Sequence, residues 1–228
     1  KSNSRVIGEA LWMQLLPEDL EIRDRYKLLI GSVVPRPIAF VATISPGGAH
    51  NLAPYSFFTA VGSDPMTLLF CPATMADGTD KDTLRNCLPP EEGGVGEFVV
   101  NVATEGYARK VAAAAEVLPY GESEFELTGL TPIPSSKVRP PRLAESPVCF
   151  ECETLQVLRT NPGQPASGNV VMGQVVAVHI DEELIDERLH IDADLLGAIG
   201  RMGGPGYCRT RDRFEMPRGR EALNRRDS

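Results

Sequence analysis

The chain has 228 residues and a formal net charge of −8, with 42% hydrophobic and 24% charged residues. This length suits one sizeable domain, and the acidic balance disfavours nucleic acid or an anionic membrane as the main partner. No apolar run approaches the roughly 18 residues of a membrane-spanning helix, and the first residues lack the apolar core of a signal peptide. We therefore expect a cytoplasmic protein that binds neither nucleic acid nor membrane.

In chain order, residues 1–26 are expected to form an arm or short helices. The β-rich stretches at 37–44 and 51–61 flank the turn-forming "SPGGAH" and predict a hairpin. Pro54 lacks an N–H group, so it should mark an edge strand or a bulge, and we predict a break in the ladder between Ala53 and Phe57. Phe57 and Phe58 alternate along the strand, so one of them should belong to the core.

Four more strands are predicted at residues 66–71, 97–103, 147–158 and 169–180. Six strands with few helices between them favour an antiparallel barrel that closes to hide its edges. A helix is predicted in "DKDTLRNCL", capped by Asp80 or Asp77, and a second over residues 104–118, which Pro119 stops. Residues 216–228 should form an Arg-rich, solvated tail.

Several kinds of chemistry lack their motifs. The histidines (His50, His179 and His190) have no zinc-binding spacing, and there is neither a nucleophile elbow nor a phosphate-binding P-loop. Cys149 and Cys152 are three apart on a strand and should face opposite ways, so we predict no dithiol or metal site. The glycines of "GGVGEF" precede a strand, whereas a Rossmann motif has them after one. Any NAD(P)H must therefore bind in another way.

The segment "KDT" (Lys81, Asp82 and Thr83) begins the first predicted helix. Unpaired N–H groups at a helix start, a lysine ammonium and a threonine hydroxyl together make a candidate phosphate site. The alternative is that Asp82 is an ordinary first-turn acid and Lys81 a solvated charge.

A series of motifs is similar, in this order, to the flavin reductase-like family of FMN-binding split-barrel proteins. They are "RPIAFVATISPGGAHNLAPYSFFTAV", "KDT", "EFVVNVA", "SEFELTGLTP", "ESPVCFECE", "GQVVAVHID" and "GRMGGPGYCRT". The family includes flavoredoxin and the reductase components of two-component flavin monooxygenases. The resemblance implies an all-β dominated fold over residues 27–215, a six-stranded antiparallel split β-barrel with Greek-key character and peripheral helices. It also implies a homodimer with FMN near the subunit interface.

By the same resemblance, the segment containing Pro54 would lie against the isoalloxazine ring. Backbone groups near Ser56 and Phe57 would then be free to bond the ring edge. The candidate cofactor-binding residues are Arg36, Ala42, Thr43, Asn51, Ala53, Ser56, Phe57, Cys71, Lys81, Asp82 and Thr83. Among them, Arg36, Ala42 and Thr43 would border the ribityl chain and phosphate, and "KDT" would lie at the phosphate. Arg201 and Tyr207 would contribute to a lid.

The implied activity is that of an NAD(P)H:flavin oxidoreductase, in which NADH or NADPH passes hydride to flavin N5. No catalytic side chain is expected, because the flavin carries the chemistry. Two alternatives remain: a flavoredoxin-type electron-transfer protein with tightly bound FMN, and a flavin-binding module without turnover. A flavin-dependent monooxygenase or another redox protein would be the partner.

Overall fold

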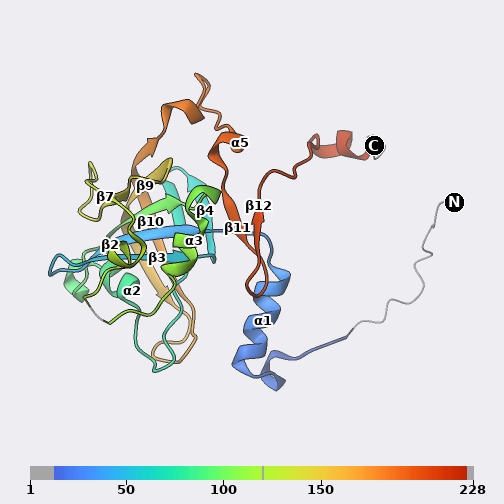
Figure 1. The fold of residues 1–228 in the computed structure, drawn as a ribbon. Helices are drawn as coiled ribbons and strands as arrows, with labels where there is room; N and C mark the ends of the chain where they lie inside the picture. Colours follow the sequence, from blue (N-terminus) through green and yellow to red (C-terminus); the bar gives the residue numbers. More distant parts are fainter. Residues whose placement is uncertain (1–12, 120, 225–228) are drawn as a thin grey trace.

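A computed structural model of the chain describes residues 13–119 and 121–224 (Figure 1). Residues 1–12 of the expected arm and 225–228 of the expected tail lie outside this range. The centre is a seven-stranded antiparallel sheet in the order β3-β2-β6-β9-β10-β5-β4. Its strands are β2 (Ala39–Ile44), β3 (His50–Tyr55), β4 (Phe58–Ser63), β5 (Met66–Phe70), β6 (Glu97–Val102), β9 (Val148–Arg159) and β10 (Asn169–Ile180).

The edge strand β3 pairs with β2 in one unbroken register, and Pro54 lies opposite Phe40. The Leu52 N–H points away from β2, because it donates to the Glu124 carboxylate. Pro54 is two residues further along the strand, so its nitrogen also points away from β2. No ladder bond is lost by its missing N–H group. The edge position is thus confirmed. The ladder is regular through Tyr55, without a bulge, and the predicted break occurs at Ser56 and Phe57.

The interruption divides one expected strand into β3 and β4, which form the two opposite edges of the sheet. A chain covers at most about 3.5 Å per residue, so Tyr55 and Phe58 are no more than about 11 Å apart. The sheet must therefore curl until its edges approach each other, although they do not pair. The expected all-β dominated, antiparallel fold with peripheral helices is confirmed, but the sheet has seven strands rather than six and is not closed.

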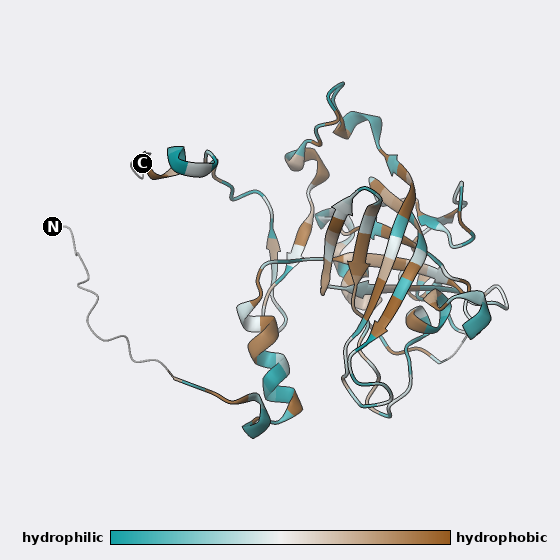
Figure 2. Ribbon diagram, turned by 180° about the vertical axis from the view of Figure 1, so that it is seen from behind, coloured by the Kyte–Doolittle hydropathy of each residue, from teal (hydrophilic) through white to brown (hydrophobic). Residues whose placement is uncertain are grey.

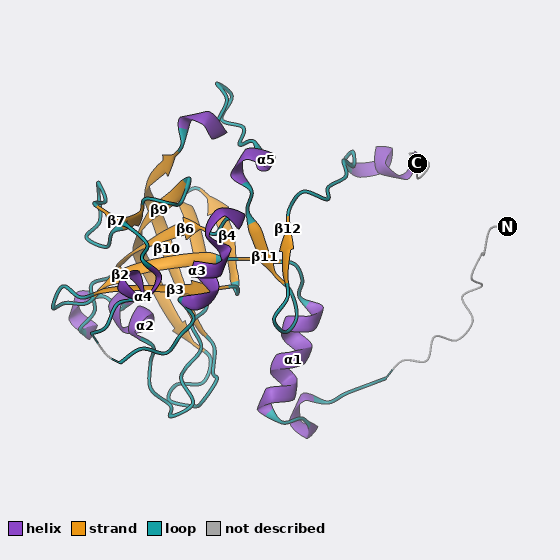
Figure 3. Ribbon diagram, viewed as in Figure 1, coloured by secondary structure: helices purple, strands orange, loops and turns teal. Residues whose placement is uncertain are grey.

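Two hydrophobic clusters lie on the two faces of the sheet, as the alternation along β2 illustrates. Phe40 and Ala42 belong to the outer cluster, and Ala39 and Val41 to the inner one. The outer cluster includes residues of α3 (Ala108–Ala113) and α4 (Glu124–Thr128), and the inner cluster includes residues of α2 (Asp82–Cys87) (Figure 3).

Cys149 belongs to the outer cluster and Cys152 to the inner one, so the two thiols face opposite ways, as predicted. Phe58 packs against the inner cluster, which confirms that one of the two adjacent phenylalanines joins the core.

The helices are shorter than expected. Instead of one helix over 104–118, a 3₁₀ turn (Glu105–Tyr107) precedes α3, which ends at Ala113. The backbone of Tyr107 is not helical, and its buried ring stacks on Phe40 with ring centroids 6.2 Å apart. This tertiary contact accompanies the break between the 3₁₀ turn and α3.

The predicted capping of α2 is also wrong. Lys81 occupies the N-cap position, without a capping side-chain hydrogen bond. Asp80 instead forms a bidentate pair with Arg159 (2.8 and 2.6 Å), and Asp77 accepts a bond from the Thr79 N–H group. The glycines of "GGVGEF" do precede β6, and a Cβ at Gly94 would collide with the carbonyl oxygen of Leu88.

A second, smaller unit lies beside the sheet (Figure 1). It consists of α1 (Ile22–Ser32), which crosses the boundary expected at residue 26, and a three-stranded sheet of β1 (Arg36–Pro37), β11 (Ile199–Arg201) and β12 (Tyr207–Arg209). The remaining elements are short: β7 (Pro132–Ile133), β8 (Arg142–Leu143), α5 (Ala193–Leu196) and 3₁₀ turns at Pro17–Asp19, Pro90–Glu92, Glu182–Leu184 and Gly219–Asn224.

The helix α1 has hydrophobic segments along its ribbon (Figure 2), and several of its apolar side chains are exposed. Ile22, Tyr26, Leu29 and the following Val33 are each more than half exposed, whereas only Ile30 is buried. Their spacing of four, three and four residues places them on one side of the helix. Among the described helices, none is long and apolar enough to cross a bilayer.

Candidate functional site

The inner face of β3 and the start of α2 bring together several predicted residues. The Asn51 side-chain amide donates to the hydroxyls of Thr43 (3.2 Å) and Thr83 (2.8 Å). Asn86, which the sequence reasoning missed, donates to Thr43 from one turn further along α2 (3.0 Å). Thr43 and Thr83 are fully buried. These bonds fix α2 against β2 and β3. Both threonines therefore hold the surrounding elements in place, while being too buried to contact a ligand at the surface.

Lys81 is the one residue of "KDT" that presents an unpaired charge. Its ammonium lies 5.8 Å from the ring centroid of Tyr55, and it forms no ion pair with a carboxylate in the described part of the chain. Partial burial of the ammonium lowers the pKa of Lys81. Asp82, by contrast, pairs with Arg85 at 3.5 Å. Because α2 has only six residues, Lys81 contributes more to any anion binding here than the helix dipole does.

A small, shallow hollow lies beside this network. It is lined by Ser45, Ala49, His50, Asn51, Asp82, Asn86, Gly121 and Glu122. Two of these residues are carboxylates, and the lining contains neither lysine nor arginine. This hollow therefore disfavours a phosphate, which leaves the Lys81 side of β3 as the candidate anion site.

The residues at the other end of β3 form a second group. Arg36 is buried, and its Nε donates to the Ser56 hydroxyl at 3.2 Å, while its guanidinium lies 5.9 Å from the Phe57 ring centroid. The Phe57 carbonyl, which was expected to be free, accepts a bond from the Cys71 N–H group at 2.8 Å. Phe57 and Cys71 are thus held side by side at the link between the sheet edges.

Arg36 bonds Ser56, and the Lys81 ammonium lies 5.8 Å from the ring centroid of the preceding residue, Tyr55. One predicted residue, Ala42, faces another way. Ala42 lies opposite Leu52, and both side chains belong to the outer cluster. The Ala42 side chain therefore faces away from the inner surface that Ala53 borders.

Arg201 and Tyr207 belong to the Arg36 end of the site. In the β1–β11 pair, Arg201 lies directly opposite Arg36. Its guanidinium lies over the Tyr207 ring, 4.5 Å from the centroid. The β11–β12 hairpin stands beside the large sheet within one chain (Figure 1). The expected lid residues thus lie next to the link between β3 and β4.

The sequence reasoning also missed two buried carboxylates. Glu124 on α4 accepts the outward Leu52 N–H at 2.8 Å and so covers part of the exposed edge of β3; burial raises its pKa. Glu124 lies in the motif "SEFELTGLTP", but the residues of that motif do not indicate that Leu52, 72 residues away, is its partner.

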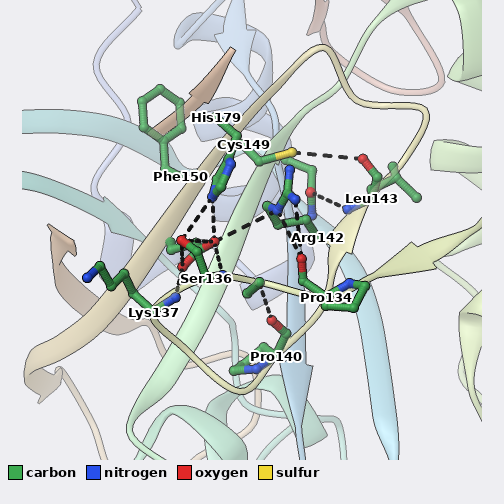
Figure 4. Close-up of polar contacts among 12 residues, drawn as sticks. Pro134, Ser136, Lys137, Pro140, Arg142, Leu143, Cys149, Phe150 and His179 are labelled. Carbon is green, nitrogen blue, oxygen red and sulfur yellow. Dashed lines mark hydrogen bonds and ion pairs between the residues drawn. The ribbon is translucent and has the colours of Figure 1, made fainter. Parts of the chain in front are cut away.

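The second carboxylate, Glu151 on β9, is fully buried and fastens the segment 134–142 to the sheet (Figure 4). It accepts bonds from the backbone N–H groups of Ser136 (2.7 Å) and Lys137 (2.6 Å), and it lies 2.6 Å from His179 Nε2 on β10. Burial alone would raise the pKa of Glu151, but these bonds outweigh it, so the pKa lies below its ordinary value. The cluster is structural and lies apart from the inner face of β3.

Comparison with known proteins bears on the whole chain. The sequence model of the flavin reductase like domain matches residues 30–196. The uncharacterised protein YwrF of Bacillus subtilis (strain 168) is 38% identical over 203 residues, which are 88% of this chain and 96% of YwrF.

Two solved structures are similar throughout. Nitrilotriacetate monooxygenase component B from Bacillus cereus matches with a TM-score of 0.84 at 33% identity, over 91% of this chain and 100% of that one. The 2-nitrobenzoate 2-nitroreductase NbaA from Pseudomonas fluorescens matches with a TM-score of 0.79 at 33% identity, over 91% and 97%.

The Glu151 cluster predicts a pH dependence of stability. Since the folded-state pKa lies below the ordinary 4.5, its contribution is present above that pH and is lost as the pH falls through the folded-state pKa. Glu151→Gln should lower the free energy of unfolding at pH 7 by about 2 kcal/mol, because the amide cannot accept all three bonds. Urea unfolding from pH 7 to pH 3 should show the difference shrinking in acid. Glu126→Gln, an exposed control, should change little, and a constant difference at all pH values would contradict the assignment.

Proposed function

Since the chain belongs to the flavin reductase-like family, we propose that it binds FMN beside the edge strand β3, near Lys81 and the Ser56–Phe57 link, and passes hydride from NADH or NADPH to it. The family supports an oxidoreductase that uses a flavin. One observation carries the finer assignment: β3 is bordered by a cation without an ion-pair partner among the described residues, Lys81, and by the Ser56–Phe57 link.

The residues beside β3 fit an elongated flavin nucleotide. Lys81 would bind the phosphate, and the small side chain of Ala53 would let the ligand approach the strand closely. Ser56, Phe57 and Cys71 would border the ring at the link. The network of Thr43, Asn51, Thr83 and Asn86 would hold Lys81 at a fixed separation from that link.

When bound, FMN supplies the hydride-accepting chemistry, so the protein needs only to hold and orient it. The chain's own residues neutralise the phosphate charge at Lys81 and fix the strand that lies beneath the ligand. The positive charge of Arg36 lies at the Ser56 end, where it favours negative charge on any group bound beside the link.

Two destinations for the electrons are supported by the similar structures. The likeness to component B of a monooxygenase favours transfer to a separate flavin-dependent monooxygenase. The likeness to a nitroreductase favours direct reduction of a small acceptor on the bound flavin. A flavoredoxin-type role in electron transfer between proteins is the remaining alternative to hydride uptake from a nicotinamide.

The proposed activity can be tested by mixing the FMN-loaded protein with NADH or NADPH without oxygen. We expect the visible absorbance of the flavin to bleach rapidly with at least one donor. If dithionite bleaches the flavin and neither nicotinamide does, hydride uptake is wrong and the electron-transfer alternative holds.

The assignment of the phosphate to Lys81 predicts a selective loss of affinity. A charge-assisted hydrogen bond contributes about 1.5–3 kcal/mol, so Lys81→Gln should weaken FMN binding by about tenfold or more. Riboflavin, which lacks the phosphate, should bind the variant and the parent equally. Fluorescence titration measures both. Lys27→Gln, which removes a lysine paired with Asp24 on α1, is the matched control. An equal loss for both ligands would show that Lys81 acts on the fold instead.

We also propose that the protein is a homodimer, because the apolar face of α1 is unpartnered within one chain. Burying it against a second copy would add to an interface that should exceed about 1,000 Å². Light scattering should give twice the 24.7 kDa mass of the chain. A stable monomer that is saturated with FMN would overturn this proposal.

A further inference from the structure

Two arginines face each other next to the link between β3 and β4. In the antiparallel β1–β11 pair, Arg36 and Arg201 are direct partners. Burial lowers the pKa of Arg36, and the nearby charge of Arg201 acts in the same direction. Like charges directly opposite each other in a ladder repel, so this contact disfavours the pairing of β1 with β11 unless something compensates it.

The acceptors that hold the Arg36 guanidinium are all neutral. They are the carbonyl oxygens of Ile30 (2.6 Å), Val33 (2.7 Å) and Met202 (3.0 Å) and the Ser56 hydroxyl (3.2 Å). Such acceptors orient a guanidinium and satisfy its hydrogen bonds, but they do not cancel its charge. The side chain is buried, so its positive charge is only weakly screened by solvent.

Arg201 is held in the same manner but keeps donors free. Its guanidinium donates to the carbonyl oxygens of Gly206 (3.2 Å) and Gly204 (3.0 Å). The other three of its five N–H donors have no hydrogen-bond partner among the described residues. By contrast, Arg209 on the adjacent strand forms an ion pair with Glu105. In residues 13–119 and 121–224, neither Arg36 nor Arg201 has such a pair, although the chain as a whole is acidic.

We propose that Arg201, supported by the buried charge of Arg36, binds a phosphate group of the nicotinamide dinucleotide donor. The inference rests on the proposed function, in which the donor must reach the flavin ring at the Ser56 end of β3. A fixed guanidinium with free N–H groups matches a phosphate bidentately. The chain carries no dinucleotide fingerprint, so the phosphates of the donor require a site of another kind.

The flavin's own phosphate is the other possible source of this group. The proposed function already assigns the flavin phosphate to Lys81, so a second phosphate site at the arginine pair calls for another phosphate. Since Arg36 bonds Ser56 directly, the arginine pair belongs to the end of β3 that we assign to the ring. A phosphate at this end is therefore assigned to the donor.

The test compares Arg201→Gln with Arg209→Gln, a matched loss of charge on the same hairpin at a residue already paired with Glu105. Binding of NAD⁺ and NADP⁺ to the FMN-loaded proteins is measured by calorimetry. Flavin reduction without oxygen is measured with NADH, NADPH and N-benzyl-dihydronicotinamide, which carries the reactive ring and no phosphate.

We expect Arg201→Gln to weaken the binding of NAD⁺ or NADP⁺ and to raise the KM for the matching reduced donor, each by about tenfold. The rate with the benzyl compound and the affinity for FMN should not change. Arg209→Gln should resemble the parent, and Arg201→Lys should retain part of the affinity as a point charge. Added salt should weaken donor binding more in the parent than in Arg201→Gln.

If Arg201→Gln binds both dinucleotides as tightly as the parent does, this inference is overturned, but the proposed function is not. A loss of FMN affinity without a loss of dinucleotide affinity also overturns it, because the phosphate is then the flavin's. If no donor, including the benzyl compound, reduces the flavin of the parent, the proposed function fails and the inference fails with it.

Discussion

The two-residue link at Ser56 and Phe57 determines how the large sheet is shaped. It joins strands that lie at opposite edges, so the remaining five strands must curve between two points no more than about 11 Å apart. The curl separates an inner cluster from an outer one and leaves the edges unpaired. The same link receives the Arg36 side chain at Ser56 and the Cys71 N–H at Phe57, so the bend and its surroundings are fixed together.

Polar groups, rather than helix capping, position the other end of the site. The buried side chains of Thr43, Asn51, Thr83 and Asn86 bond one another across β2, β3 and α2. A buried polar group without a hydrogen-bond partner costs free energy. Such a network therefore favours the one arrangement of α2 on the sheet in which its side chains are hydrogen-bonded. A six-residue helix can therefore be held firmly enough to place Lys81, although its intrinsic stability is low.

Much of the sheet could be predicted from the sequence, because the strands are β-rich apolar runs and turn residues separate them. The bend at Ser56 and Phe57 could not, since nothing in "NLAPYSFFTAV" distinguishes one long strand from two that diverge. The predicted long helix is interrupted at Tyr107, whose ring packs on Phe40, a contact that no local pattern indicates. Glu151 escaped notice because its partners lie 14, 15 and 28 residues away, where local patterns carry no information.

The strand order has a consequence for how the chain folds during synthesis. The early strands form two separate groups, β2, β3 and β6 on one side and β4 with β5 on the other, which do not pair with each other. The hairpin of β9 and β10 pairs with β6 and with β5, and so completes the sheet, but it is made about eighty residues after β6. At about 5–20 residues per second, the ribosome needs roughly 4–16 s to supply it. For that time the unpaired edges of β5 and β6 are available to other chains, which makes this interval the one in which a chaperone would matter most.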